Sequence, residues 1–231
     1  MRASAIIVAA GSGSRLGRAE PKAFVPLGGR PMLYYSLAAV ARVAGIAEII
    51  VTVPSGMEKA ARACAVAAGA ADLPIKITPG GAERQDSVRI GLALASAESD
   101  LVIVHDAARP LASPDLFAAC LAAAERAGGA IAAIAVADTL KRVADGAITA
   151  TISRAGLWQA QTPQAFRRPI LIAAHERALS EKIAATDDAD LAERIGARVE
   201  VVESIAPNLK ITTPADLAMA ESILVSRGGN A

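Results

Sequence analysis

Two basic residues stand beside a glycine-rich segment near the start of the chain. The segment reads Ala9-Ala-Gly-Ser-Gly-Ser-Arg15-Leu-Gly17, and Lys22 follows shortly after it. Glycines allow a backbone to close around an anion and to present its N–H groups to phosphate. The spacing departs from a dinucleotide-binding loop, which has glycine where Leu16 stands, and from a P-loop, which ends in Gly-Lys-Ser/Thr. Because Arg15 and Lys22 add two positive charges, the segment favours a triphosphate. A surface loop with solvated charges is the alternative.

A carboxylate follows a strongly apolar run later in the chain. The run Leu101-Val-Ile-Val leads into His105 and Asp106, and Arg109 stands just before Pro110. In open α/β sheets, ligands bind beyond the carboxyl ends of the strands. There Asp106 would hold Mg²⁺ or a substrate hydroxyl, since Mg²⁺ at phosphate sites takes only one or two protein carboxylates. The alternative is that Asp106 caps a turn. We expect His105 to be a histidine at the edge of the core rather than a base.

Two further segments combine polar residues with an expected helix start. Gly80-Gly81 precede a helix that carries Ser87, and such an N-terminus can bind a nucleobase edge, a ribose or a phosphate. An ordinary turn and cap is the alternative. Thr186-Asp-Asp-Ala-Asp190 has the composition of a metal site, but a threonine cap followed by acids satisfies the helix dipole equally well, and we favour the cap.

Alternating strands and helices must position these residues. The expected strands cover residues 5–10, 47–53, 75–78, 101–105, 130–137 and 198–203. The expected helices cover 31–43, 55–68, 83–97, 114–127 and 169–180, with two more opening at Thr186 and after Thr213-Pro214. This alternation predicts an α/β fold with a Rossmann-like, doubly wound and mostly parallel sheet. The length of 231 residues and the absence of a linker favour a single domain over residues 1–231.

A hairpin interrupts the alternation. Two short extended runs, 138–143 and 147–154, flank Ala144-Asp145-Gly146, and Asp-Gly at such a place is a strong hairpin signal. A hairpin added to an α/β domain has few neighbours that would bury its apolar side chains. It either packs on its own body or exchanges across a dimer, and we favour the dimer.

Composition excludes several classes of protein. Lys and Arg total 24 against 23 Asp and Glu, a net charge of +1, so we expect no nucleic-acid partner. The longest apolar run, Leu116 to Ala124, is far shorter than the roughly 20 residues that span a bilayer, so we expect no membrane anchor. Cys64 and Cys120 have no second Cys or His at ligand spacing. We therefore expect buried free thiols and a cytoplasmic protein.

Taken together, the segments resemble the 2-C-methyl-D-erythritol 4-phosphate cytidylyltransferases, CTP-dependent enzymes of non-mevalonate isoprenoid synthesis. The resemblance extends over nearly the whole chain. It is carried by the segments 9–17, 21–24, 80–87, 105–110 (His-Asp-Ala-Ala-Arg-Pro), 138–142, 157–164 (Leu-Trp-Gln-Ala-Gln-Thr-Pro-Gln), 186–188 and 208–212. Segments 105–110 and 157–164 are the narrower signals, because the glycine loop is shared by many nucleotidyltransferases.

The resemblance implies a reaction. A phosphate oxygen of the polyol phosphate would attack the α-phosphorus of CTP, and pyrophosphate would leave. Arg15 and Lys22 would stabilise the negative charge that develops, together with Mg²⁺ bridging the triphosphate oxygens. No general base is needed because the attacking phosphate is already anionic. A chain with only two histidines, His105 and His175, agrees with that chemistry.

The resemblance also assigns roles by position. The expected catalytic residues are Arg15, Lys22, Arg154 and Lys210, the last two positioning the attacking phosphate. The expected CTP-binding residues are Ala9, Ala10, Gly11, Gly13, Gly81, Ser87 and Ala107. The expected substrate-binding residues are Asp106, Arg109, Thr139 and Thr186, with Asp106 also the candidate metal ligand. Thr139 and Arg154 flank the hairpin, which is the dimerisation arm of the family, so a homodimer would share composite sites.

One departure and several alternatives remain open from the sequence. Ala82 stands where family members often carry an acidic residue, so a side-chain contact to cytosine or ribose would be absent and backbone groups would read the base. A ribitol 5-phosphate cytidylyltransferase would share the loop and the reaction. A non-catalytic nucleotide-sensing module is disfavoured because the charged residues of the site are all present. A nicotinamide-dependent dehydrogenase is disfavoured by Leu16 and by the two cations of the loop.

Overall fold

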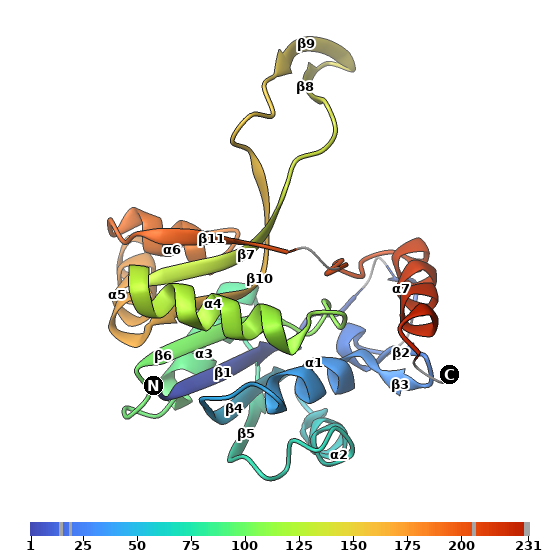
Figure 1. The fold of residues 1–231 in the computed structure, drawn as a ribbon, viewed down its shortest axis with the longest axis vertical. Coiled ribbons are helices and arrows are strands. Elements are labelled where there is room, and N and C mark those ends of the chain that lie inside the picture. The colour runs from blue at the N-terminus through green and yellow to red at the C-terminus, as the bar shows by residue number, and fades with distance from the viewer. Residues whose placement is uncertain (14–15, 19, 205–206, 229–231) are drawn as a thin grey trace.

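A twisted central sheet organises the chain (Figure 1). The computed structural model describes residues 1–13, 16–18, 20–204 and 207–228. The sheet has seven strands in the order β11 (Val199–Glu203), β7 (Gly129–Ala135), β10 (Trp158–Arg167), β6 (Leu101–Asp106), β1 (Ala3–Val8), β4 (Ile46–Val53) and β5 (Ile75–Pro79). All neighbouring pairs are parallel except those of β10, which runs antiparallel to both β6 and β7. The predicted mostly parallel sheet is therefore confirmed.

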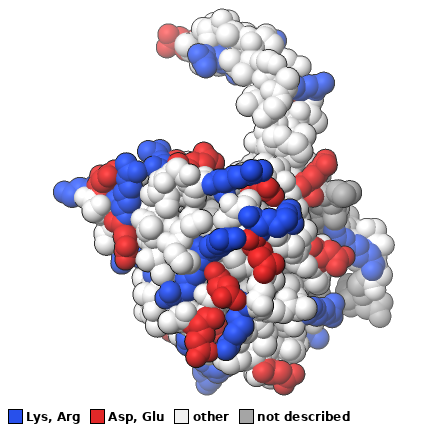
Figure 2. All heavy atoms as spheres, turned by 60° about the vertical axis from the view of Figure 1, so that its left-hand side comes forward, with Lys and Arg blue, Asp and Glu red and all other residues white. Residues whose placement is uncertain are grey.

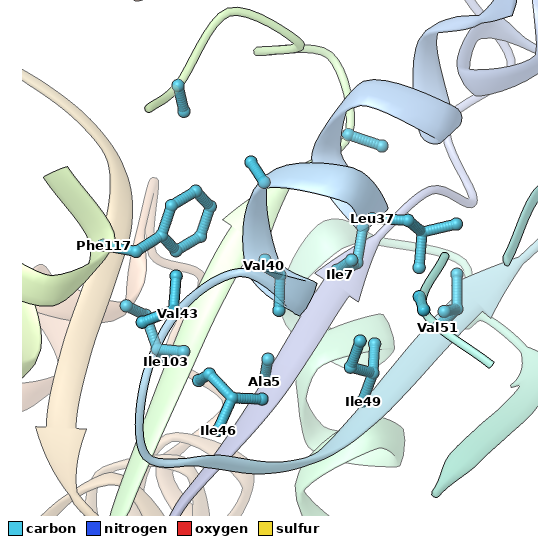
Figure 3. Close-up of a cluster of buried hydrophobic side chains, with 14 of the residues drawn as sticks. Ala5, Ile7, Leu37, Val40, Val43, Ile46, Ile49, Val51, Ile103 and Phe117 are labelled. Carbon is cyan, nitrogen blue, oxygen red and sulfur yellow. The ribbon is translucent and has the colours of Figure 1, made fainter. Parts of the chain in front are cut away.

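Helices cover both faces of the sheet because successive residues of the buried strands point to opposite sides. Ile7 faces a cluster with α1 (Met32–Ala41), α2 (Glu58–Ala67) and α4 (Pro114–Ala127), where Leu37, Val40 and Phe117 pack (Figure 3). Ile6 faces the other side, where α3 (Arg84–Leu94), α5 (Arg168–Glu181) and α6 (Asp188–Arg194) pack. Each large apolar side chain buried in this way contributes about 1.5–3 kcal/mol.

The end of the chain packs beside the segment that follows the glycine loop. This segment contains η2 (Lys22–Phe24), β2 (Pro26–Leu27) and β3 (Arg30–Pro31), and Leu27 of β2 shares a small core with Leu217 and Ala220 of α7 (Pro214–Ser226). Thr213 caps α7 by accepting from Asp216 N at 3.2 Å, and Pro214 takes the first helical position, as the sequence predicts. Among the described residues, no helix has both the length and the apolar content to cross a membrane.

The predicted hairpin stands away from the body as an arm (Figure 1). β8 (Leu140–Ala144) and β9 (Ala147–Ile152) form a two-stranded sheet of their own. Asp145 and Gly146 have φ angles of 50° and 78°, as a turn matched to the strand twist requires. Val143 and Ile148 on the arm are 55% and 65% exposed, so the hairpin does not pack on its own body. In the surface view, both signs of charge intermingle on the visible face of the body, and the arm also carries charged side chains among uncharged ones (Figure 2).

The strand β10 is absent from the sequence-based prediction. Its first half is polar, Trp158-Gln-Ala-Gln-Thr, and Pro163 lies within it, so it lacks the apolar alternation of a strand. The pairing with β7 shifts register between Ala160 and Gln164, which accommodates the proline. Because β10 enters between β6 and β7, it brings Thr162 Oγ1 to the backbone N–H of Asp106 at the end of β6 and pairs Gln164 with Val104.

Candidate active site

A cavity of about 290 Å³ opens at the carboxyl ends of β1 and β6. Val8 pairs with Asp106 at the last position of the two strands, and Ala107 N continues the ladder to Val8 O at 3.0 Å. The glycine-rich loop and the Asp106 segment therefore leave the sheet side by side. Ten of the residues predicted from the sequence line this cavity: Ala9, Ala10, Gly11, Gly13, Lys22, Gly81, Ser87, Asp106, Ala107 and Lys210.

The glycine loop folds back onto Lys22, the second basic residue of the segment. Lys22 N donates to Gly11 O at 3.3 Å, and Gly13 has a φ of 70°. A Cβ at position 13 would lie 2.6 Å from Lys22 Cβ, closer than carbon atoms approach. Glycine is therefore required for Lys22 to lie against the loop. Arg15, the other expected cation, lies outside the described residues.

The first turn of α3 forms the opposite wall. Ser87 Oγ accepts from Gly81 N at 3.1 Å and donates to Glu83 O at 3.2 Å, and Asp86 Oδ2 accepts from Glu83 N. Ser87 thus fixes the turn at Gly81 as a local brace, and it also lines the cavity. The cap that the sequence offered as one alternative is therefore present, and a binding role for the same residues stays a prediction.

Asp106 lies at the floor of the cavity between two cations. Its Oδ2 accepts from Lys210 Nζ at 2.7 Å, and its Oδ1 accepts from Arg84 Nε at 2.9 Å. Burial alone would raise the pKa of this carboxyl, but Arg84 and Lys210 outweigh that effect and hold the pKa well below its ordinary value. Asp106 therefore stays ionised and keeps Lys210 turned toward the cavity.

Arg84 continues the charged chain away from the cavity. Its Nη1 donates to Asp188 Oδ2 at 2.9 Å, and the other oxygen of Asp188 lies 3.0 Å from His175 Nε2. Gln164 Oε1 accepts from the backbone N–H of Asp188 at 3.1 Å. The sequence predicted no site role for Arg84, His175 or Gln164, and Asp188 was considered only as one of the acids in the 186–190 segment. Only their place in the family motifs, for Arg84, Asp188 and Gln164, singled them out beforehand.

His105 is buried in the core, as expected. It is 1% exposed, with Nδ1 3.1 Å from Thr162 Oγ1 and Nε2 3.2 Å from Arg109 O. Burial lowers the pKa of His105 to about 4, against the opposing pull of Asp106. At neutral pH the ring is therefore uncharged and shielded from the cavity, which suits a structural histidine rather than a base.

Comparison with known proteins identifies the family of this arrangement. The family model for 2-C-methyl-D-erythritol 4-phosphate cytidylyltransferase matches residues 3–226. The chain belongs to this family. It is similar to the 2-C-methyl-D-erythritol 4-phosphate cytidylyltransferase of Syntrophotalea carbinolica, with 44% identity over 96% of each chain. Another relative of the same name, from Cereibacter sphaeroides, is 43% identical over 99% of this chain and 100% of its own.

Solved structures of cytidylyltransferases share the fold. 4-diphosphocytidyl-2C-methyl-D-erythritol synthase from Anaerococcus prevotii superposes with a TM-score of 0.84 at 33% identity, covering 97% of this chain and 98% of its own. The 2-C-methyl-D-erythritol 4-phosphate cytidylyltransferase from Thermus thermophilus gives a TM-score of 0.80 at 38% identity, covering 96% and 98%. The chain is accordingly a nucleotidyltransferase of the cytidylyltransferase type.

Four residues expected in the cytidylyltransferase site do not line the cavity. Arg109 is buried, and its Nη1 donates to Asn208 O at 2.8 Å, so its guanidinium braces the segment that carries Lys210. Thr139 and Arg154 are exposed at the two ends of the arm. Thr186 is exposed and does not cap α6, because Asp187 takes that place by accepting from Asp190 N at 3.0 Å. The expected threonine cap is therefore wrong by one residue.

The described donor set fits a divalent cation carried mainly by phosphate. Residues 1–13, 16–18, 20–204 and 207–228 contain no group of three or more His, Cys, Asp or Glu side chains that would hold a metal ion. The described acidic residues that line the cavity are Glu83 and Asp106. Each oxygen of Asp106 accepts one hydrogen bond and keeps a second lone pair, so a cation bound to phosphates can add this carboxylate as a ligand.

Proposed function

We propose that the chain condenses CTP with 2-C-methyl-D-erythritol 4-phosphate to give 4-diphosphocytidyl-2-C-methyl-D-erythritol and pyrophosphate. The observation that carries this proposal is the cavity in which the glycine loop, Lys22, and the Asp106–Lys210 pair meet. The family membership of residues 3–226 supports it. The relatives' printed names specify the same acceptor, so ribitol 5-phosphate is not favoured.

The chemistry follows from the charges of the site. In nucleotidyl transfer, negative charge accumulates on the α-phosphoryl oxygens and on the departing pyrophosphate. Lys22 beside the glycine loop supplies a fixed positive charge there, and Lys210 is oriented by Asp106 to hold the attacking phosphate. A general base is unnecessary because that phosphate is anionic at neutral pH. Arg15 is proposed as a second stabilising cation on the resemblance alone.

A divalent cation completes the charge balance in this proposal. Mg²⁺ neutralises triphosphate charge when it is bound, and Asp106 is the protein carboxylate placed to reach it. Lys22 would contact the triphosphate directly, and Lys210 would contact the attacking phosphate. The requirement is tested by titrating EDTA against turnover.

We propose that the arm joins two copies of the chain and completes their sites. It stands away from the body and exposes the apolar Val143 and Ile148, which a second copy would cover. Arg154 and Thr139 do not line the cavity of their own chain, so the arm is their route to a partner's cavity. Their role would be to position the polyol phosphate.

The remaining partners and the location follow from the surface and the thiols. We propose a cytoplasmic enzyme, because Cys64 and Cys120 are free and buried, as in a reducing compartment. With a net charge of +1, the chain is proposed to act on small anions without nucleic acid or membrane partners. Ala82 offers no polar side chain, so recognition of the base is assigned to backbone groups of the cavity wall.

The deciding experiment is pyrophosphate release in the presence of Mg²⁺. CTP is paired with 2-C-methyl-D-erythritol 4-phosphate and, separately, with ribitol 5-phosphate, and ATP, GTP and UTP replace CTP in parallel reactions. We expect release with CTP and the methylerythritol substrate. Release only with ribitol 5-phosphate would overturn the acceptor, and silence with every pair would favour a nucleotide-sensing module.

A further inference from the structure

A chain of buried charges runs from the cavity floor into the body of the protein. Lys210 and Arg84 hold the two oxygens of Asp106, Arg84 reaches on to Asp188, and Asp188 meets His175. The side chains at the far end of this path are the least exposed: Lys210 is 40% exposed, Arg84 24% and Asp106 9%, whereas His175 and Asp188 are 3% and 1% exposed. The far end of the path contacts neither the cavity nor solvent.

Asp188 is held from three directions. His175 lies against its Oδ1, Arg84 donates to its Oδ2, and Gln164 accepts from its backbone N–H. Burial would raise the pKa of Asp188, but the charge of Arg84 and the hydrogen bond of His175 keep it below its ordinary value. A carboxylate bonded at both oxygens has a fixed plane, so it can direct the guanidinium of Arg84.

The orientation of Arg84 in turn decides which oxygen of Asp106 can accept a hydrogen bond from Lys210. Arg84 donates from Nε to Asp106 Oδ1 and from Nη1 to Asp188 Oδ2. The other oxygen of Asp106, Oδ2, therefore accepts from Lys210. Without the negative charge at Asp188, Arg84 is free to turn its fork onto both oxygens of Asp106, because bidentate pairing with a carboxylate is its preferred geometry. Lys210 would then lose the partner that turns it toward the cavity.

We propose that Asp188, supported by His175, is a positioning residue for nucleotidyl transfer that acts through Arg84 and Asp106 on Lys210. The inference rests on the proposed function. Buried ion pairs add little net stability compared with apolar side chains of equal volume. The role inferred for these ion pairs is therefore to orient the side chains. Since Lys210 is assigned to the attacking phosphate, the effect falls on the acceptor rather than on CTP.

The test compares Asp188→Asn with a matched buried carboxylate elsewhere. Glu48 is 4% exposed and accepts from Lys76 Nζ at 2.8 Å and from Ser4 Oγ at 2.6 Å, near the amino ends of the strands whose carboxyl ends form the cavity. We expect Asp188→Asn to lower kcat/KM for the polyol phosphate by about 10–100-fold, with KM for CTP within about twofold. Glu48→Gln lowers thermal stability but leaves both constants near wild type.

A double-mutant cycle separates positioning from general damage. In a Lys210→Ala background, Asp188→Asn is expected to change kcat/KM by less than about threefold, because the residue through which it acts is already gone. His175→Phe, which removes the ring nitrogens, is expected to show a smaller loss than Asp188→Asn with the same bias toward the acceptor.

Three results would overturn the inference. They are an unchanged kcat/KM in Asp188→Asn, an equal loss in Glu48→Gln, or full additivity of Asp188→Asn with Lys210→Ala. Each is a ratio to the wild-type rate with CTP and 2-C-methyl-D-erythritol 4-phosphate. A wild-type protein that releases no pyrophosphate contradicts the proposed function instead, so the two failures are distinguishable.

Discussion

Asp106 is the residue at which the charges of the site meet. It ends a strand whose pairing with β1 places it beside the glycine loop, and Lys210 and Arg84 engage its two oxygens. Its paired cations keep its pKa well below the ordinary value, so its charge is constant over the physiological range. The site therefore works with fixed charges, and its activity is sensitive to the loss of any one of them.

Replacement of Lys22 by alanine tests the electrostatic role of the loop. We expect Lys22→Ala to lower kcat by about 10²–10³, the scale for losing one preorganised donor at the transition state. The fold should survive because only the side chain is removed. Steady-state pyrophosphate release measures kcat, and the exposed Lys59→Ala on α2 serves as the control. Wild-type turnover in Lys22→Ala would remove this residue from the mechanism.

His105 makes the stability of the protein depend on pH. The pKa of the buried ring is lowered to about 4 from an ordinary value of 6.5, so the unfolded chain binds the proton more readily. The stabilisation is complete above pH 6.5 and is lost as the pH falls toward 4. We expect wild type to lose about 2 kcal/mol of unfolding free energy between pH 7 and pH 5 from this group.

Urea denaturation of wild type and His105→Gln at both pH values measures that contribution. The variant should lose correspondingly less between pH 7 and pH 5, because glutamine does not titrate. The pKa values of Asp106 and Asp188 are lowered from their ordinary value of 3.8, so these carboxyls do not change the stability between pH 7 and pH 5. Equal losses in both proteins would show that His105 titrates normally in the folded state.

At the scale of elements, the position of α3 against the sheet sets the width of the cavity. Arg84, Ser87 and the Gly81 turn all belong to its first turn or precede it. Farther along the helix, Gly91 is buried against β1, and a Cβ there would lie 2.7 Å from Ile6 Cγ2. The helix and the strand therefore approach each other as closely as glycine permits.

Gly91→Ala tests this close approach. Alanine favours a helix over glycine by about 1 kcal/mol, but overpacking of a fully buried β-branched neighbour costs about 1–3 kcal/mol. We expect a net loss of unfolding free energy in chemical denaturation and a raised KM for CTP, because α3 is displaced from the glycine loop. Arg89→Ala on the exposed face of α3 is the control, with a change within about 0.5 kcal/mol. A stabilised Gly91→Ala protein would contradict the packing argument.

At the scale of the whole molecule, the arm is unlike the rest of the chain. Its two strands pair with each other in a sheet of their own that stands away from the body (Figure 1), and its apolar Val143 and Ile148 are exposed. The cavity lies on the body, away from the two arm residues assigned to substrate. In the proposed dimer, a second copy would bury the arm and complete each site.

Mixed dimers test whether sites are shared. Lys22→Ala and Arg154→Ala chains carrying different affinity tags are combined, and the doubly tagged dimer is isolated. If Arg154 acts in the partner's cavity, one of the two sites contains both native residues, and activity should return to about half of wild type. If each site is built from one chain, the mixed dimer stays as inactive as its parents, and the composite site is wrong.

The sequence by itself determined the features that depend on near neighbours. Alternating apolar runs predict the parallel strands, Asp145-Gly146 predicts the hairpin, and Thr213-Pro214 predicts the start of α7. Two signals predicted ten residues of the cavity lining: the rule that ligands bind beyond the carboxyl ends of strands, and the family motifs. These signals are local because periodicity, turn conformation and helix capping involve residues only a few positions apart.

Only the tertiary structure decided which distant residues meet. Arg84 and Asp188 are 104 positions apart, as are Lys210 and Asp106, and nothing in their spacing announces a contact. The polar strand β10 carries no clear period, yet it fills the place between β6 and β7 and brings Gln164 to the backbone of Asp188. Strand order and helix packing depend on the burial of the whole apolar surface at once, so the charged chain behind Asp106 follows from the fold rather than from any single motif.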